Sequence, residues 1–91
     1  MESINNEEMF RQLGRNIARY RKFHEFSQEK LAEKAFISRG FLSHIEAPNM
    51  QTAFSIATVF DIARALNIEP KVLFEFTDDT PVAESAKNTH R

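Results

Sequence analysis

The chain has 91 residues, of which 42% are hydrophobic and 27% charged, and it contains no cysteine. This length allows one compact domain and excludes a large enzyme core, while the lack of cysteine excludes disulfides and cysteine-based metal sites. The sequence has no apolar run long enough to span a membrane, and its N-terminus lacks the features of a signal peptide, so we expect a cytoplasmic protein.

The charges are unevenly distributed, although the formal net charge is only −1. Between Arg11 and Asn49 the chain has eight arginines and lysines against four glutamates, whereas the other residues include four positive and nine negative side chains. A basic segment with acidic flanks suits a protein that presents one face to a polyanion. Ordinary protein surfaces show gradients of this size as well, so the feature alone does not identify a partner.

The sequence predicts an all-α fold, because it has only two glycines and three prolines and shows no sustained alternation of apolar and polar residues. The predicted helices cover residues 7–24, 28–34, 38–46, 56–66 and 70–76. Before them we expect an N-terminal arm of residues 1–6, and after them a flexible C-terminal tail of residues 77–91. Residues 7–76 then form the folded domain.

Each predicted helix begins at a residue that favours a helix start. Asn6 can cap the first helix, and Pro70 suits the first turn of the last one. Ser27, Ser38 and Ser55 each follow an apolar residue and precede another by four positions. This is the pattern of a serine N-cap combined with a hydrophobic staple.

The third predicted helix is separated from the second by residues 35–37 alone, and so short a link makes two helices cross steeply, as in a helix-turn-helix motif. At about 100° per residue its side chains fall into two arcs. The apolar arc carries Phe41, Leu42 and Ile45. The polar arc carries Arg39, Gly40, Ser43 and His44. We expect the apolar arc to pack on the core and the polar arc to face outward.

The polar arc has two interpretations at this point. Arginine can bond guanine in a DNA major groove, and serine and histidine can bond base edges or phosphates. The same composition is typical of a plain solvated helix face. Gly40 costs the helix up to about 1 kcal/mol relative to alanine, so its presence calls for a reason. The close approach of a ligand to the backbone is one such reason, and a tolerated accident is the other.

Several spaced segments resemble the Cro/phage-repressor (Xre-type) helix-turn-helix transcriptional regulators. The resemblance covers about residues 10–76. Its most specific elements, in chain order, are Ser27-Gln28 with Leu31-Ala32, Ile37-Ser38, Ile45-Glu46 and Ile62-Ala63-Arg64-Ala65-Leu66. It implies a compact five-helix bundle of the lambda-repressor-like type that binds double-stranded operator DNA, usually as a homodimer on pseudo-palindromic half-sites.

The resemblance also implies roles for individual residues. The positions that match the family's base-reading residues are Arg39, Gly40, Ser43 and His44. The positions expected to contact DNA phosphates are Gln28, Ser38, Asn49, Gln51 and Thr52. Gln28 would in addition brace the first base-reading side chain. Arg21 and Glu46 match a structural ion pair that joins the first helix to the end of the third.

Two features depart from the family pattern. The turn position often held by glycine is Phe36, where a left-handed backbone would be costly. We therefore expect either a rebuilt turn or an exposed or interface aromatic residue. Ala47-Pro48 follows the third helix in place of the family's usual residues, and the loop from Ala47 to Phe54 is about two residues longer than is usual there.

The sequence gives little support for catalysis, and we expect neither enzyme activity, nor a cofactor, nor a metal site. Phe60, Phe74 and Phe76 favour core or dimer surface over a ligand pocket. The favoured function is a DNA-binding transcriptional regulator. The alternative is a protein-interaction module on the same fold, such as an antitoxin that sequesters a partner protein.

Overall fold

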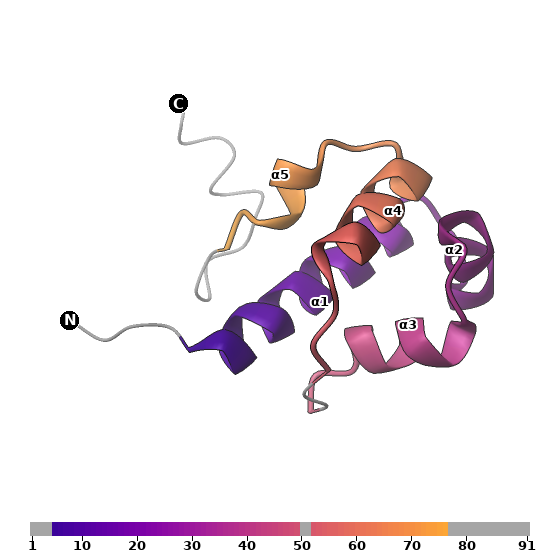
Figure 1. Cartoon of the computed structure of the whole chain (residues 1–91). Coiled ribbons are helices and arrows are strands. Elements are labelled where there is room, and N and C mark those ends of the chain that lie inside the picture. The colour runs from indigo at the N-terminus through magenta and orange to yellow at the C-terminus, as the bar shows by residue number, and fades with distance from the viewer. Residues whose placement is uncertain (1–4, 50–51, 77–91) are drawn as a thin grey trace.

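The structure is a computed structural model that describes residues 5–49 and 52–76. Within these residues it consists of five helices and no strand, so the all-α fold predicted from the sequence is confirmed (Figure 1). The helices are α1 (Asn6–Phe23), α2 (Gln28–Ala35), α3 (Arg39–Glu46), α4 (Ile56–Leu66) and α5 (Pro70–Leu73). Most of the expected N-terminal arm, the loop residue Gln51 and the whole expected tail 77–91 lie outside the described residues.

Serine side chains start three of the helices, as the sequence predicts. The Oγ atoms of Ser27, Ser38 and Ser55 each accept a hydrogen bond from the backbone N–H three residues later, at N–O distances of 3.0, 3.0 and 3.2 Å. The prediction for α1 is wrong by one residue, because Asn5 is the N-cap and its Oδ1 accepts from the Glu8 N–H at 2.8 Å. Two adjacent asparagines have equal capping ability, so the pattern alone could not choose between them.

The last helix is shorter than predicted. The periodic apolar residues suggested a helix through residue 76, whereas α5 ends at Leu73. The buried side chain of Asn16, from the middle of α1, donates through Nδ2 to the Leu73 carbonyl at 2.8 Å and to the Glu75 carbonyl at 3.3 Å. Because a side chain of another helix donates to these carbonyls, α5 can end at Leu73 without leaving buried hydrogen-bond acceptors unsatisfied.

Three helices end in the same backbone turn. Glu25, Phe36 and Asn67 adopt the left-handed conformation, with φ of 61°, 61° and 59°. After each, the next residue returns its N–H to the carbonyl five positions earlier: Phe26 to Arg21 at 3.1 Å, Ile37 to Ala32 at 3.0 Å and Ile68 to Ala63 at 3.0 Å. This is the Schellman motif, in which the apolar residue after the turn packs onto the core.

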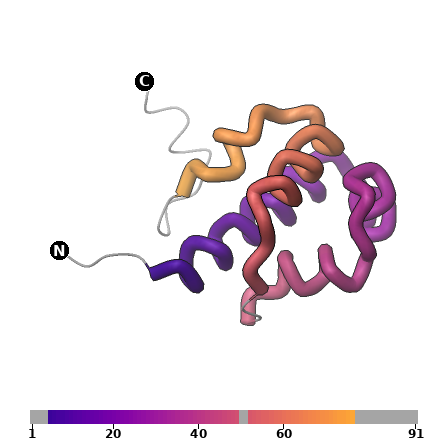
Figure 2. The backbone as a smooth tube through the Cα atoms, in the orientation of Figure 1, coloured from indigo at the N-terminus to yellow at the C-terminus, as the bar shows by residue number. Residues whose placement is uncertain are grey.

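The core lies between α1 and α2, which pack on α3 and α4 from different sides, with α5 closing one end. Its largest fully buried side chains are Ile17, Leu31, Leu42, Val59, Ile62, Leu66 and Leu73. α1 contacts α3, α4 and α5, while α2 packs against α3 and α4. The tube in Figure 2 shows that the start of α1 and the end of α5 lie on the side of the molecule away from α2. The arrangement leaves one face of α3 uncovered along an edge of the molecule (Figure 1).

Candidate nucleic-acid interface

α3 follows α2 after residues 36–38 and lies at a steep angle to it (Figure 1). Leu42 and Ile45 are buried in the core, and Phe41 is half-buried against it. Arg39, Gly40 and His44 are exposed and Ser43 is half-buried. The two arcs derived from the helical period therefore separate as expected. Within the described residues Arg39 forms no ion pair, so its guanidinium is available to an outside acceptor.

No steric constraint inside the fold requires glycine at position 40. A Cβ built on this residue would meet no heavy atom within 4 Å. Its φ also lies outside the left-handed range, because both glycines of the chain lack a positive φ. An alanine would therefore fit at this position and favour the helix. The absence of a side chain leaves a smooth gap in the polar arc, over which an outside molecule can approach the backbone.

The end of α3 is fixed by a nearly buried ion pair. Arg21 on α1 donates to Glu46 through Nε at 2.8 Å and through Nη2 at 2.9 Å, and the two side chains are only 12% and 5% exposed. The third arm of the guanidinium, Nη1, donates to the Phe26 carbonyl at 2.7 Å. Because a two-bonded arginine–carboxylate pair has a defined geometry, it sets the orientation of α3 relative to α1.

Gln28 joins this network from the start of α2. Its Nε2 donates to Oε1 of Glu46 at 3.0 Å. The resemblance implied that this amide would brace the first base-reading side chain, yet within the described residues no hydrogen bond links it to Arg39. In this structure Gln28 instead connects the beginning of α2 to the end of α3, and no hydrogen bond among the described residues uses its second amide N–H or its carbonyl oxygen.

The other residues expected to contact phosphates lie at both ends of α3. Ser38 uses its Oγ as an acceptor for the Phe41 N–H at 3.0 Å, which leaves the hydroxyl hydrogen for an outside acceptor. In the loop after α3, Asn49 is exposed and Thr52 is half-buried, whereas Gln51 is outside the described residues. Ser38 therefore lies at the start of α3 and Asn49 three residues beyond its end, whereas Thr52 shares a hollow with Asn6, Glu7 and Phe10 of α1.

Gly14 is a positioning residue that the sequence analysis missed. A Cβ on this α1 residue would lie 2.0 Å from the Ile45 carbonyl oxygen and 3.1 Å from its carbon. Both atoms belong to the backbone and cannot rotate away, so only glycine lets α1 approach the end of α3 this closely. A signal was present, since a glycine inside an amphipathic helix weakens the helix and therefore calls for a reason.

Phe36 occupies the turn between α2 and α3. The turn keeps the left-handed geometry despite the bulky residue, with φ 61° and ψ 39°. The Phe36 side chain is 84% exposed. Of the two expectations raised by the sequence, the exposed aromatic residue is found and a rebuilt turn is not.

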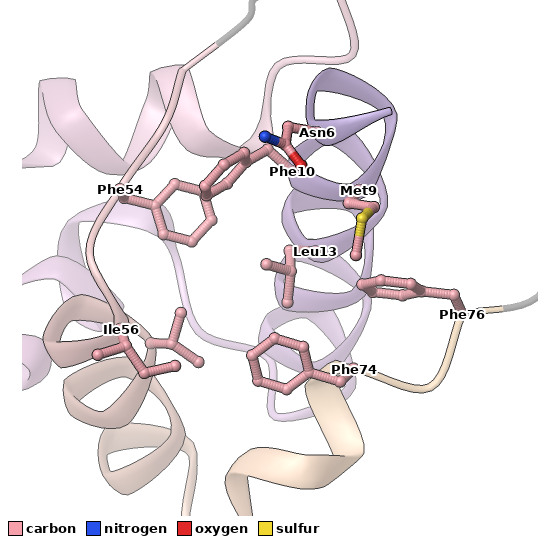
Figure 3. A pocket seen from close by; sticks show the side chains of 9 residues that line it. Asn6, Met9, Phe10, Leu13, Phe54, Ile56, Phe74 and Phe76 are labelled. Atoms are coloured by element: carbon pink, nitrogen blue, oxygen red, sulfur yellow. The ribbon is translucent and has the colours of Figure 1, made fainter. Parts of the chain in front are cut away.

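A second surface lies at the other end of the molecule, where α1, α4 and α5 meet. Apolar side chains from these helices and the segments beside them converge on a hollow of about 280 Å³ (Figure 3). Those that Figure 3 labels around it include Met9, Leu13, Phe54, Ile56, Phe74 and Phe76. Of the three phenylalanines predicted as core or dimer surface, Phe60 and Phe74 are exposed and Phe76 packs against the core, while Phe74 and Phe76 line this hollow.

The described residues contain no group of three or more histidine, aspartate and glutamate side chains placed to hold a metal ion. Among the helices that the structure describes, none combines the length and the apolar character needed to cross a membrane.

Comparison with known families identifies the class of the protein. A family model described as a helix-turn-helix domain matches residues 14–78, which include α2, α3 and the turn between them. The chain therefore belongs to the helix-turn-helix domain family.

Individual relatives narrow this class. The chain is 35% identical over 68 residues to the HTH-type transcriptional regulator SinR of Bacillus licheniformis, a match that covers 75% of this chain and 60% of that protein. The N-terminal DNA-binding domain of SinR from Bacillus subtilis superimposes with a TM-score of 0.67 at 32% identity, covering 76% of this chain and 99% of that one. The restriction-modification controller protein C.AhdI from Aeromonas hydrophila gives 0.67 at 29% identity, covering 71% and 96%. These matches confirm the resemblance to Xre-type regulators.

Proposed function

We propose that the chain acts as a sequence-specific DNA-binding transcriptional regulator that places α3 in the major groove of operator half-sites. The observation that carries the proposal is the way the fold presents α3. Its polar arc is exposed apart from the half-buried Ser43, its apolar arc packs on the core, and its last residue is held by the Arg21–Glu46 pair. A helix fixed in this way meets a groove without first having to be ordered. The names of SinR and C.AhdI as a regulator and a controller protein support the same function.

The polar arc supplies the base contacts in this proposal. Arg39 begins α3, and the N-terminal residues of a recognition helix are those that reach base edges. Its free guanidinium suits O6 and N7 of guanine, while Ser43 and His44 offer donors and acceptors one turn further along. Gly40 lets the groove edge approach the helix backbone, because no side chain fills the space beside it.

Phosphate contacts at both ends of α3 would set its register. Ser38 at the start of α3 and Gln28 near its end each retain a donor that the fold does not use, and Asn49 and Thr52 belong to the loop that follows the helix. Gln51 is assigned the same role from its position in the sequence. Such contacts hold a protein on the duplex without specifying bases.

The exposed apolar surface at α4 and α5 suits a second copy of the chain. Ile56 and Phe60 lie four residues apart on one side of α4, and Ile56 shares the hollow with Phe74 from the end of α5 (Figure 3). Burying this surface against the same surface of a second copy would form a two-fold dimer. Two α3 helices would then face two half-sites of a pseudo-palindrome.

The test of DNA binding is the selection of bound duplexes from a random pool, repeated at two salt concentrations. We expect a palindromic consensus and an affinity that falls steeply with salt. Arg39→Ala and His44→Ala should each weaken binding to that consensus by about 1–3 kcal/mol and relax preference at one base position. Lys71→Ala removes an exposed charge from α5 and serves as the control, with a small effect on all sequences alike. Failure of the parent chain to enrich any sequence would refute the proposal.

The dimer is tested with Phe60→Ser, because Phe60 is 49% exposed and its replacement leaves the core intact. Sedimentation equilibrium should show a dimer for the parent chain and a weaker dimer or a monomer for the variant. Binding to a full site should then weaken more than binding to an isolated half-site. If Arg39→Ala and His44→Ala keep full activity while Phe60→Ser loses it, the chain is instead a protein-interaction module.

A further inference from the structure

The three Schellman turns of this chain provide an internal comparison for Phe36. Their left-handed residues have nearly the same φ, and those at the ends of α2 and α4 differ by only a few degrees in φ and ψ. Asn67 fits such a turn because asparagine tolerates the left-handed region, and Glu25 places a charged side chain in water. Phe36 is the bulky apolar member of the set.

Phe36 stabilises the fold neither through its backbone conformation nor through burial of its ring. The left-handed conformation crowds its Cβ against the following carbonyl, and a bulky residue with positive φ is an outlier. The ring remains 84% exposed, so burial of apolar area does not compensate. The residue after it, Ile37, makes the apolar contact that the motif requires. An asparagine or glycine would form the same turn without exposing a ring to water.

The position of Phe36 indicates what the ring contacts. It lies two residues before Ser38, the N-cap of α3, and three before Arg39, so it sits beside the end of α3 that reads bases in the proposed function. Two basic residues, Lys34 and Arg39, are exposed within three positions of Phe36 in the chain, against one acidic residue, Glu33, and the Lys34 Nζ lies 5.6 Å from the centre of the Phe26 ring. An exposed apolar ring whose neighbours in the chain are mostly basic suits the edge of a DNA groove better than an apolar protein surface.

We propose that Phe36 is a DNA-contacting residue whose ring packs on apolar groups at the groove edge, namely thymine methyl groups or deoxyribose carbons. The inference rests on the proposed DNA-binding function and adds an apolar contact to its polar reading set. Apolar contact with a thymine methyl is a recognised form of base reading. A contact with deoxyribose would add affinity without adding sequence preference.

The test separates the fold from DNA binding with Phe36→Asn, which reproduces the turn found at Asn67. The control is Glu25→Asn, which places asparagine at the same φ in another Schellman turn, one that does not precede α3. Phe36→Asn should keep or raise the melting temperature and weaken binding to the duplex selected by the parent chain by about tenfold. Glu25→Asn should leave that affinity within about twofold of the parent's value.

Replacing thymine by deoxyuridine in the selected duplex distinguishes the two apolar sources. If the ring packs on a methyl group, the parent chain loses affinity for the uracil duplex and Phe36→Asn does not. If it packs on deoxyribose, uracil changes neither protein, and Phe36→Asn is weaker on both duplexes.

Two results would overturn the inference while leaving the proposed function intact. One is a Phe36→Asn variant that binds the selected duplex as tightly as the parent chain, which would place the ring outside the DNA contact. The other is a clear fall in its melting temperature, which would show that the ring supports the fold. If the parent chain selects no DNA at all, the proposed function and the inference fail together.

Discussion

The close contact between α1 and α3 leads to a prediction for two glycines of the chain. Gly14→Ala places a methyl group against the Ile45 carbonyl, whereas Gly40→Ala places the same group in open space. Both positions are helical, so the substitution improves helix propensity at each by up to about 1 kcal/mol. The tertiary contact should therefore decide the sign of the change in stability.

The magnitude follows from the distance. A methyl carbon at 2.0 Å from an oxygen must retreat to about 3.3 Å, so α1 and α3 have to separate locally by roughly 1.3 Å. The obstructing atom is backbone, and α3 is held by the Arg21–Glu46 pair, so the strain should reach the upper end of the 1–3 kcal/mol that is typical (about 3). After the gain in propensity, the net loss is about 2 kcal/mol, which lowers the melting temperature by about 8–16 °C in a domain of this size.

Thermal unfolding followed by circular dichroism measures both variants. Gly14→Ala should melt well below the parent chain, and Gly40→Ala should melt up to about 4–8 °C above it. The effect of Gly40→Ala on DNA binding should be opposite to its effect on stability. If the groove edge approaches the helix backbone at Gly40, the added methyl group weakens binding to the selected duplex. A Gly14→Ala variant as stable as the parent would refute the steric reasoning, and a Gly40→Ala variant with full affinity would make Gly40 a tolerated accident.

Three further predictions concern single side chains. Arg21→Leu should lower the free energy of unfolding by about 3–5 kcal/mol in urea titrations. The substitution leaves the nearly buried Glu46 carboxylate with Gln28 as its remaining hydrogen-bond donor in this network. Adding Glu46→Leu should recover part of the loss. Ser38→Ala should cost about 1 kcal/mol through the lost cap, as should Ser27→Ala, but only the former should also weaken DNA binding. Burial and the nearby Glu75 carboxylate, partly opposed by Arg19, raise the pKa of Tyr20 above its ordinary value of 10.0. The stabilisation that this pKa shift provides is complete below the ordinary pKa, and it is lost as the pH rises through the raised pKa of the folded state. Urea midpoints above about pH 10 should therefore fall less in Tyr20→Phe than in the parent, and equal slopes would contradict the assignment.

Local signals in the sequence were sufficient for the helices and for the division of α3 into two faces. A serine N-cap satisfies backbone donors a few residues away, and a helical period of 3.6 residues sorts neighbours by face, so both depend on short stretches of chain. This is why Ser27, Ser38 and Ser55 fall at helix starts and why Leu42 and Ile45 turn inward. The arrangement of the helix-turn-helix likewise followed from the short link between α2 and α3. The DNA contacts assigned to Arg39, Gly40, Ser43 and His44 stay predictions.

The tertiary structure decided what depends on residues far apart in the chain. α5 ends at Leu73 because Asn16, 57 positions earlier, supplies the donor for its carbonyl. Gly14 is required because the Ile45 backbone passes beside it, and no periodicity of α1 contains that information. Phe36 keeps a left-handed turn against its own preference because the backbone bonds of the motif and the burial of Ile37 hold it there. The sequence alone thus determined where helices form and which face each buries. The meeting of distant segments determined where α5 ends, how closely α1 approaches α3 and how the turn at Phe36 is held.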